Sequence, residues 1–245
     1  MRIAHITDLH LRHHLPGTAE IPARLSRQMP DYFARAIDQI AALAPDLLVL
    51  SGDLLDYPMD ALEDPALQAL GRQDLQLIAR LLEKLSVPVA LVYGNHDHPA
   101  LIAQVFPHAS RDFVCAGHRV LVFADEEGPR HVPQRTGDER ARYRAALADL
   151  HSPPQIHVQH YVVWPERNQD YPHTYGAGEQ MRAEIIASGN VRLVLSGHYH
   201  AGVPPLADKG VTFATAPSFA EPPHPFWTYD LNGGKVLWQA HRLAF

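Results

Sequence analysis

Gly94-Asn95-His96-Asp97 is the stretch that decides the fold, because it follows the apolar segment Val87–Tyr93 and carries three potential metal ligands in a row. Carboxylate oxygens, imidazole nitrogens and amide oxygens are donors that hold divalent first-row metals. Four more such groups each follow a hydrophobic run: Asp8-Leu9-His10, Gly52-Asp53, His160 and Gly197-His198-Tyr199-His200. One such group can arise by chance, whereas five in this arrangement indicate a shared site.

The segments that precede the five groups have the composition of β-strands. They are Arg2–Thr7, Asp46–Ser51, Val87–Tyr93, Gln155–Gln159 and Arg192–Ser196. Some contain uninterrupted apolar runs, which are typical of strands covered on both faces. In layered α/β proteins ligands collect at the carboxyl ends of the strands, so the spacing predicts that the five groups converge in space.

Helices and further strands are predicted around these segments. Apolar residues at helical spacing predict helices over Ser26–Ala44, Pro65–Leu85, Gly137–Leu150 and Gly178–Ala187. Val120–Ala124 is expected to join one of the sheets. Beyond Gly202, the strand-like segments are Val211–Thr215, Phe226–Leu231 and Lys235–Gln239, with Asn232-Gly233-Gly234 as a hairpin turn. We expect these C-terminal strands to form the second sheet of a two-sheet sandwich.

The five groups together resemble the D-x-H, G-D, G-N-H-D, H and G-H-x-H blocks of calcineurin-like metallophosphoesterases, in the same order from Asp8 to His200. The resemblance implies an α/β fold, namely a four-layer α/β/β/α sandwich of two mixed β-sheets flanked by helices. It also implies a metal site at the C-terminal ends of the strands. We expect residues 1–245 to form a single domain of this kind.

The resemblance further implies two divalent metal ions, with Asp53 as the carboxylate that bridges them. A mixed nitrogen and oxygen ligand set suits Mn or Fe, with Zn as the alternative. The ligands of the first metal would be Asp8, His10, Asp53 and His200. The ligands of the second would be Asp53, Asn95, His160 and His198. Two metals about 3.5–4 Å apart can clamp the attacking and leaving oxygens of a phosphoryl displacement.

Two residues are expected to act catalytically rather than as ligands. By the resemblance, His96 sits beside the metals and contacts the substrate or leaving group, and Asp97 orients His96. The expected activity is hydrolysis of a phosphodiester or phosphomonoester of a small molecule by in-line attack of a hydroxide held by the two metals.

The fourth group departs from the family, because Gln159 stands where many members carry a second histidine. His160 is the better match to the ligand, and Gln159 is expected to face away from the site. His157 is a rival, but its odd spacing from His160 along a strand places it on the opposite face.

Three regions could form the substrate pocket: residues 11–25, 161–175 and 217–226. The candidate substrate-binding residues are His13, Tyr161 and Arg167. Aromatic rings and an arginine could stack a base and pair with a phosphate. An alternative is that the second of these loops simply packs on its own aromatic side chains.

The amino-acid composition limits the kinds of molecule that the chain is expected to bind and the compartment in which it is expected to occur. A net charge of −6 over 245 residues disfavours a broad nucleic-acid-binding surface, so a small phosphoester substrate is expected. No apolar run reaches the length of a membrane span, and no segment has the pattern of a signal peptide. Cys115 is the only cysteine, so a disulfide within the chain is impossible. These features favour a cytoplasmic protein; they do not indicate the oligomeric state.

Other functions remain open. A DNA-repair nuclease shares the first three blocks, but such enzymes carry further DNA-binding regions. A non-catalytic scaffold of the same fold is less consistent with a complete ligand set. Protein Ser/Thr phosphatases continue the second block with an arginine, whereas this chain continues Leu54-Leu55-Asp56-Tyr57. Taken singly, Asp8 and Asp53 could also be turn-capping residues.

Overall fold

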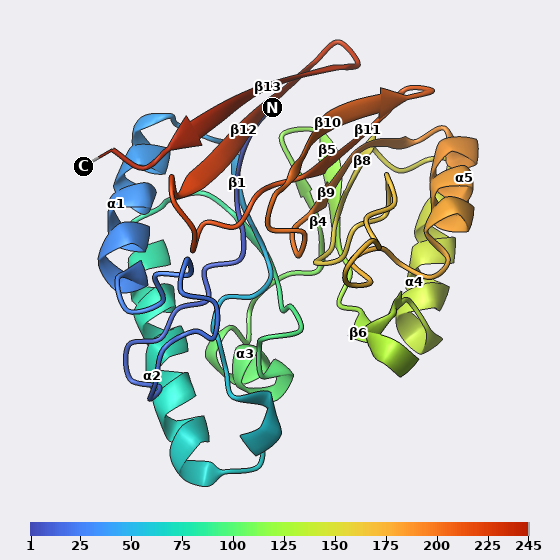
Figure 1. The fold of residues 1–245 in the computed structure, drawn as a ribbon. Helices are drawn as coiled ribbons and strands as arrows, with labels where there is room; N and C mark the ends of the chain where they lie inside the picture. Colours follow the sequence, from blue (N-terminus) through green and yellow to red (C-terminus); the bar gives the residue numbers. More distant parts are fainter. Residues whose placement is uncertain (245) are drawn as a thin grey trace.

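Strands that are apolar on both faces build two mixed β-sheets, packed face to face between two layers of helices (Figure 1). The structure is a computed structural model, and it describes residues 1–244. The predicted four-layer α/β/β/α architecture is confirmed.

The first sheet has five strands, whose order across the sheet is β13-β12-β1-β2-β3. Their bounds are β1 Arg2–Ile6, β2 Leu47–Ser51, β3 Val89–Val92, β12 Pro225–Asn232 and β13 Lys235–Arg242. β1, β2 and β3 are parallel, β12 pairs antiparallel with β1, and β13 pairs antiparallel with β12.

The second sheet has six strands in the order β10-β11-β9-β8-β5-β4. Their bounds are β4 Asp112–Cys115, β5 His118–Val122, β8 Gln155–Val158, β9 Val191–Ser196, β10 Val203–Asp208 and β11 Val211–Thr215. The four central strands are parallel, and the edge strands β4 and β10 are antiparallel to their neighbours. A separate two-stranded ribbon is formed by β6 (Glu126–Glu127) and β7 (Pro133–Gln134).

The helices cover the outer face of each sheet. α1 (Met29–Ala42), α2 (Pro65–Leu82) and α3 (Pro99–Val105) lie on the side of the first sheet. α4 (Gly137–Ala148) and α5 (Gly178–Ser188) cover the second sheet. Each observed helix begins and ends within a few residues of its predicted bounds where one was predicted, and α3 is the helix that was not predicted.

Successive side chains of β2 point to opposite faces of the sheet, so this strand contributes to two hydrophobic cores. Leu48 and Leu50 pack in the cluster that includes α1 and α2. Leu47 and Val49 point the other way, into the core between the two sheets. All four side chains are fully buried, and burying a leucine or valine contributes about 1.5–3 kcal/mol. The four residues of this apolar run therefore pack against both the helical layer and the second sheet.

The expectation that the C-terminal strands form the second sheet is wrong in detail, because these strands divide between the two sheets. β11 pairs with β9 in the second sheet, whereas β12 crosses back to pair with β1, and β13 follows it. The predicted turn is confirmed: Asn232 pairs with Lys235 across the hairpin, and Gly233 and Gly234 both have positive φ, 56° and 79°. Pairing between strands more than two hundred residues apart leaves no local signal in the sequence.

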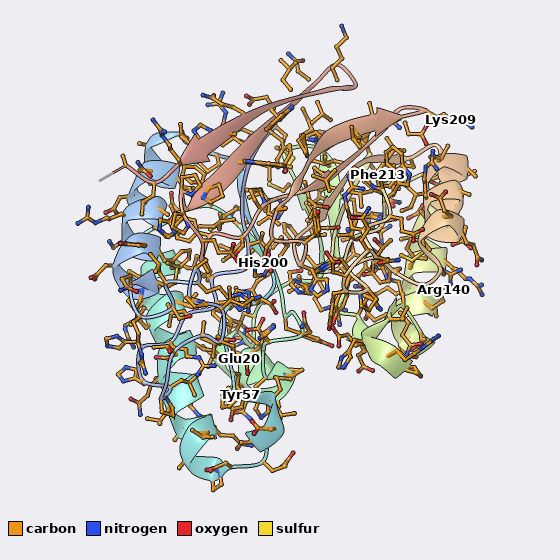
Figure 2. All side chains as sticks on the ribbon, viewed as in Figure 1. Glu20, Tyr57, Arg140, His200, Lys209 and Phe213 are labelled. Carbon is orange, nitrogen blue, oxygen red and sulfur yellow. The ribbon has the colours of Figure 1, made fainter. Side chains whose placement is uncertain are left out.

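The five groups of candidate ligands all lie at one edge of the sandwich. They follow the carboxyl ends of β1, β2 and β3 in one sheet and of β8 and β9 in the other. Figure 2 shows His200, which follows β9, near the middle of the molecule between the two halves. Among residues 1–244, no helix has the length and apolarity that a membrane crossing requires.

Candidate metal centre

Four of the candidate ligands lie on left-handed backbone, where the chain turns sharply out of a strand. The φ angles are 53° at Asp8, 43° at His10, 51° at Asp53 and 66° at His198. For a residue with a Cβ this conformation costs about 1–2 kcal/mol, and such strain clusters at functional sites. The loops are held by backbone hydrogen bonds, including Asp8 N–H to the carbonyl of Gly52 at 3.0 Å. The turns thus aim consecutive side chains into one place.

The first cluster contains Asp8, His10, Asp53 and His200, whose donor atoms all lie within 4.8 Å of one another. Nε2 of His10 lies 3.1 Å from Nε2 of His200 and 3.6 Å from Oδ2 of Asp53. Nε2 of His200 lies 3.5 Å from Oδ1 of Asp8. Two carboxylates and two imidazole nitrogens therefore converge on one point.

The second cluster contains Asp53, His160 and His198 and shares Asp53 with the first. Nε2 of His160 lies 3.5 Å from Oδ2 of Asp53 and 3.1 Å from Oδ1 of Asn95. The rings of His160 and His198 meet edge to face at 4.9 Å. The arrangement gives Asp53 neighbours on both sides, as a bridging carboxylate requires.

Donor chemistry at both clusters fits divalent metals. Two nitrogens bound to one metal at about 2.0–2.1 Å lie about 3 Å apart, as His10 and His200 do. Without a cation, these facing nitrogens could share at most one proton. Nε2 of His198 is buried and has no hydrogen-bond partner among residues 1–244. A buried, unpaired imidazole nitrogen is costly unless it binds something, which a metal would provide.

The outer nitrogens of two candidate ligands are fixed by oxygen partners. Nδ1 of His160 lies 2.7 Å from the carbonyl of Ser51, and Nδ1 of His200 lies 2.7 Å from Oε1 of Glu221. Metal-binding histidines in general carry such a partner, which sets the tautomer and the ring orientation. In both residues Nε2 is therefore the atom left to face the cluster.

The charges of the site attract cations. Burial alone would lower the pKa of His160, but the Asp53 carboxylate outweighs burial and raises that pKa to about 9. His200 behaves likewise, because Asp8 and Glu221 outweigh burial and raise its pKa to about 9. Burial also opposes ionisation of Asp53, yet the neighbouring histidines hold its pKa well below the usual range. The carboxylates thus draw positive charge into the site, and a divalent metal would replace these protons.

His96 is oriented by Asp56 and not, as expected, by Asp97. Nδ1 of His96 lies 3.0 Å from Oδ1 of Asp56, whose other oxygen accepts from Nε of Arg12 at 3.0 Å. Oδ1 of Asp56, the oxygen that faces His96, also lies 3.8 Å from Nδ1 of His10. Burial opposes protonation of His96, but the charges of Asp53 and Asp56 raise its pKa. The sequence signal for Asp56 was its place three residues after Asp53, and the prediction missed it.

The Asp97 side chain accepts hydrogen bonds from backbone N–H groups instead. Its buried carboxylate accepts N–H groups from Gly94, Leu54 and Leu55 at 2.8–3.1 Å. Burial and the nearby charge of Asp53 raise the pKa of Asp97 to about 7, against the effect of these donors. Asp97 therefore ties the loop after β3 to the loop after β2, which is a role in positioning the ligands.

The remaining predicted residues lie around the cluster. Tyr161, a predicted substrate-binding residue, is buried, and its ring packs edge-on against His160 and His198 with centroids 5.0 and 4.9 Å away. It therefore fixes the positions of the two histidine rings. His13 is exposed, and its backbone N–H donates to Asp74 at 3.1 Å. His157 is buried on the opposite face of β8 against Phe123, as expected. Gln159 points away and donates to the Leu195 carbonyl.

The loop after β8 brings further side chains beside the cluster. Arg167 and His173 line a cavity of about 290 Å³ together with Tyr199. The His173 ring lies 4.9 Å from the ring of His198 and 5.1 Å from that of Tyr199. Arg167 was predicted as a substrate-binding residue, whereas His173, which carries no motif, was predicted only as part of the candidate region 161–175.

We expect Asp56→Asn to lower kcat by about 10–100-fold, by analogy with the loss of the outer partner of a metal-ligating histidine. The amide cannot hold the His96 ring by charge, although His10 and His200 keep their donor atoms. Metal content should stay near that of the wild type. In a His96→Ala background the same substitution should have little further effect, and a full additive loss would show that Asp56 acts elsewhere.

Comparison with known proteins gives one family, two relatives and one solved structure that this chain resembles. A family model described as calcineurin-like phosphoesterase matches residues 1–202. A Psychrobacter arcticus protein named "Probable cyclic nucleotide phosphodiesterase" is 23% identical over 275 residues, covering 99% of this chain and 94% of that protein. A similarly named Synechococcus protein is 26% identical over 239 residues, covering 92% and 84%. The crystal structure of a dimetal phosphatase from Danio rerio shares the fold, with a TM-score of 0.71 at 15% identity over 99% of this chain and 96% of that one.

Proposed function

Because this chain belongs to the calcineurin-like phosphoesterase family and hydrolyses phosphoester bonds, we propose that it is a phosphodiesterase of small nucleotides that uses two divalent metals. The relatives named as probable cyclic nucleotide phosphodiesterases support the substrate class. The two clusters that share Asp53 support the pair of metals. Mn or Fe, with Zn as the alternative, suits a mixed nitrogen and oxygen ligand set.

The proposed ligands are the members of the two clusters together with Asn95, whose Oδ1 lies 3.1 Å from Nε2 of His160. The first metal would be held by Asp8, His10, Asp53 and His200, and the second by Asp53, Asn95, His160 and His198. Bound there, the metals would activate water and neutralise the charge of the phosphoester. The single observation that carries the proposal is the convergence of these donors around a shared, buried Asp53.

The chain's own groups would orient the substrate and move one proton. Asp56 holds Nδ1 of His96, which leaves Nε2 of the same ring free to donate to the leaving oxygen. The side chain of His96 is 32% exposed, whereas Asp56 is nearly buried, so His96 can reach a bound molecule. The positive guanidinium of Arg167 would meet the substrate from the cavity beside His198.

Hydrolysis of bis(4-nitrophenyl) phosphate, 4-nitrophenyl phosphate and 3′,5′-cyclic AMP by protein purified with Mn²⁺ tests the proposal. We expect turnover of the two diesters, its loss on chelation and its return with added Mn²⁺. Plasmid DNA, offered in the same assay, should be cleaved poorly because the chain carries a net charge of −6. A protein that holds two metals yet cleaves no phosphoester would overturn the proposal, and efficient cleavage of DNA would favour a nuclease.

A further inference from the structure

The cavity beside the metal centre is built from the loop after β8 and the turn after β9. Its lining residues are Glu166, Arg167, Gln169, Asp170, His173 and Tyr199. The cavity opens next to the second cluster, because His173 contacts the ring of His198 and Tyr199 is the next residue along the chain. A molecule whose phosphate lay at the metals could place its remaining part here.

The walls of the cavity are held in place by hydrogen bonds within the loop. The N–H of Arg167 donates to Oγ1 of Thr174 at 2.8 Å, and the N–H of Thr174 donates to Oδ1 of Asn168 at 2.9 Å. The N–H of His173 donates to the carbonyl of Tyr171 at 2.9 Å. A preformed pocket loses less entropy when it binds a ligand.

Flat surfaces face this cavity. The ring centroids of His173 and Tyr199 lie 5.1 Å apart at 71°, and the guanidinium carbon of Arg167 lies 5.8 Å from the Tyr199 ring. Aromatic and guanidinium planes of this kind stack on nucleobases regardless of sequence. The shape therefore suits a heteroaromatic ring better than a flexible glycerol chain.

Two carboxylates distinguish among such rings. Glu166 and Asp170 give the cavity more negative than positive charge, which repels a second phosphate. Within residues 1–244, the carboxylate of Asp170 forms no hydrogen bond or ion pair. Carboxylates accept hydrogen bonds from the exocyclic amino groups of bases. A base with an exocyclic amino group would donate a hydrogen bond to the Asp170 carboxylate, which is otherwise hydrated.

We propose that the cavity lined by His173, Tyr199 and Asp170 is a base subsite, which selects nucleotides whose base carries an exocyclic amino group. This inference rests on the proposed phosphodiesterase function and names the part of the substrate that lies outside the metal centre. The base stacks on the Tyr199 ring and meets the His173 ring, which is inclined at 71° to it, through an edge, and Asp170, aided by Glu166, accepts from its amino group. Arg167 lies over the Tyr199 ring with its guanidinium carbon 5.8 Å from the centroid, on the face that the base leaves free.

Two substrates that differ by one amino group test the subsite: 3′,5′-cyclic AMP and the 3′,5′-cyclic monophosphate of purine riboside. We expect KM to be about tenfold lower for cyclic AMP, the effect of one charge-assisted hydrogen bond. The double variant Glu166→Ala, Asp170→Ala should lose this preference and keep its turnover of bis(4-nitrophenyl) phosphate. Tyr199→Leu should raise KM for both nucleotides about tenfold with little change in kcat.

A matched double variant, Asp60→Ala with Glu63→Ala, removes two exposed carboxylates elsewhere and should keep the preference. Equal KM values in the wild type, or a preference that survives in the Glu166 and Asp170 double variant, would overturn the subsite. So would hydrolysis of bis(4-nitrophenyl) phosphate by a protein that neither cleaves nor binds nucleotides.

Calorimetry with adenosine monophosphate and purine riboside monophosphate separates the subsite from the proposed function. Tighter binding of the adenosine compound by a protein that hydrolyses no phosphoester would support the subsite and contradict the phosphodiesterase. Equal binding of the two compounds would overturn the subsite even if the enzyme were active.

Discussion

Asp53→Asn is expected to reduce phosphodiesterase turnover by more than about a hundredfold, beyond the range seen for outer partners of metal ligands. Asp53 is the one residue shared by the two clusters, so its charge acts on both proposed metals. The amide keeps the shape of the side chain but removes the negative charge between the cations. Metal content of the purified variant should fall at both sites.

We expect this variant to lose its activity while it remains folded. Asp53 accepts the backbone N–H of His96 at 2.8 Å, and the neighbouring histidines hold its pKa well below the usual range, so its charge stabilises the folded chain. The amide loses that charge, so the metal-free variant should stay folded but unfold at a somewhat lower temperature than the metal-free wild type. Asp60→Asn, at an exposed position, is the matched control and should leave turnover unchanged, and His13→Ala should cause only a small loss. Equal losses for Asp53→Asn and His13→Ala would contradict the ligand assignment.

Gly94→Ala should abolish metal binding, although it adds one methyl group and changes no ligand. A Cβ at Gly94 would lie 2.2 Å from Oδ1 of Asp53, 2.6 Å from its backbone nitrogen and 2.6 Å from Cε1 of His160. Two of these atoms are in side chains of the proposed ligands Asp53 and His160, and the third is the backbone nitrogen of Asp53, so the ligand loops must move apart. We expect turnover to fall more than about a hundredfold. Overpacking of this kind also destabilises by about 1–3 kcal/mol, to be measured by chemical unfolding.

Gly176→Ala is the control for Gly94→Ala. Neither glycine has a positive φ, so the two substitutions differ only in the space around the new methyl group. At Gly176 a Cβ would meet only Cγ1 of Val132, at 3.0 Å, and a side chain can move aside. If Gly94→Ala bound metals and turned over substrate as Gly176→Ala does, the loops after β2 and β3 would not be packed as the structure has them.

Much of the site follows from local sequence, because each ligand group directly follows its own strand. Leu47–Leu50 is apolar on every residue, which places β2 in the interior and the group after it at the end of a buried strand. Once five such ends lie in parallel strands of two packed sheets, convergence is a geometric consequence. The fold class and the neighbourhood of Asp8, Asp53 and His198 could therefore be predicted.

What the sequence could not provide were contacts set by packing across the chain. β12 pairs with β1, although more than two hundred residues separate them, and no local pattern marks that choice over the second sheet. Asp56 reaches His96 only because the loops after β2 and β3 lie side by side. Asp97 is next to His96 in sequence, but its side chain turns toward backbone N–H groups.

Metal stoichiometry, combined with electron paramagnetic resonance of the Mn²⁺-loaded protein, tests the central claim most directly. The account predicts two Mn²⁺ per chain with the spectrum of a magnetically coupled pair, since both ions would share the Asp53 carboxylate, the residue common to the two clusters. It also predicts that Asp53→Asn loses the coupling. One ion per chain, or two ions with the spectrum of isolated Mn²⁺, would contradict it.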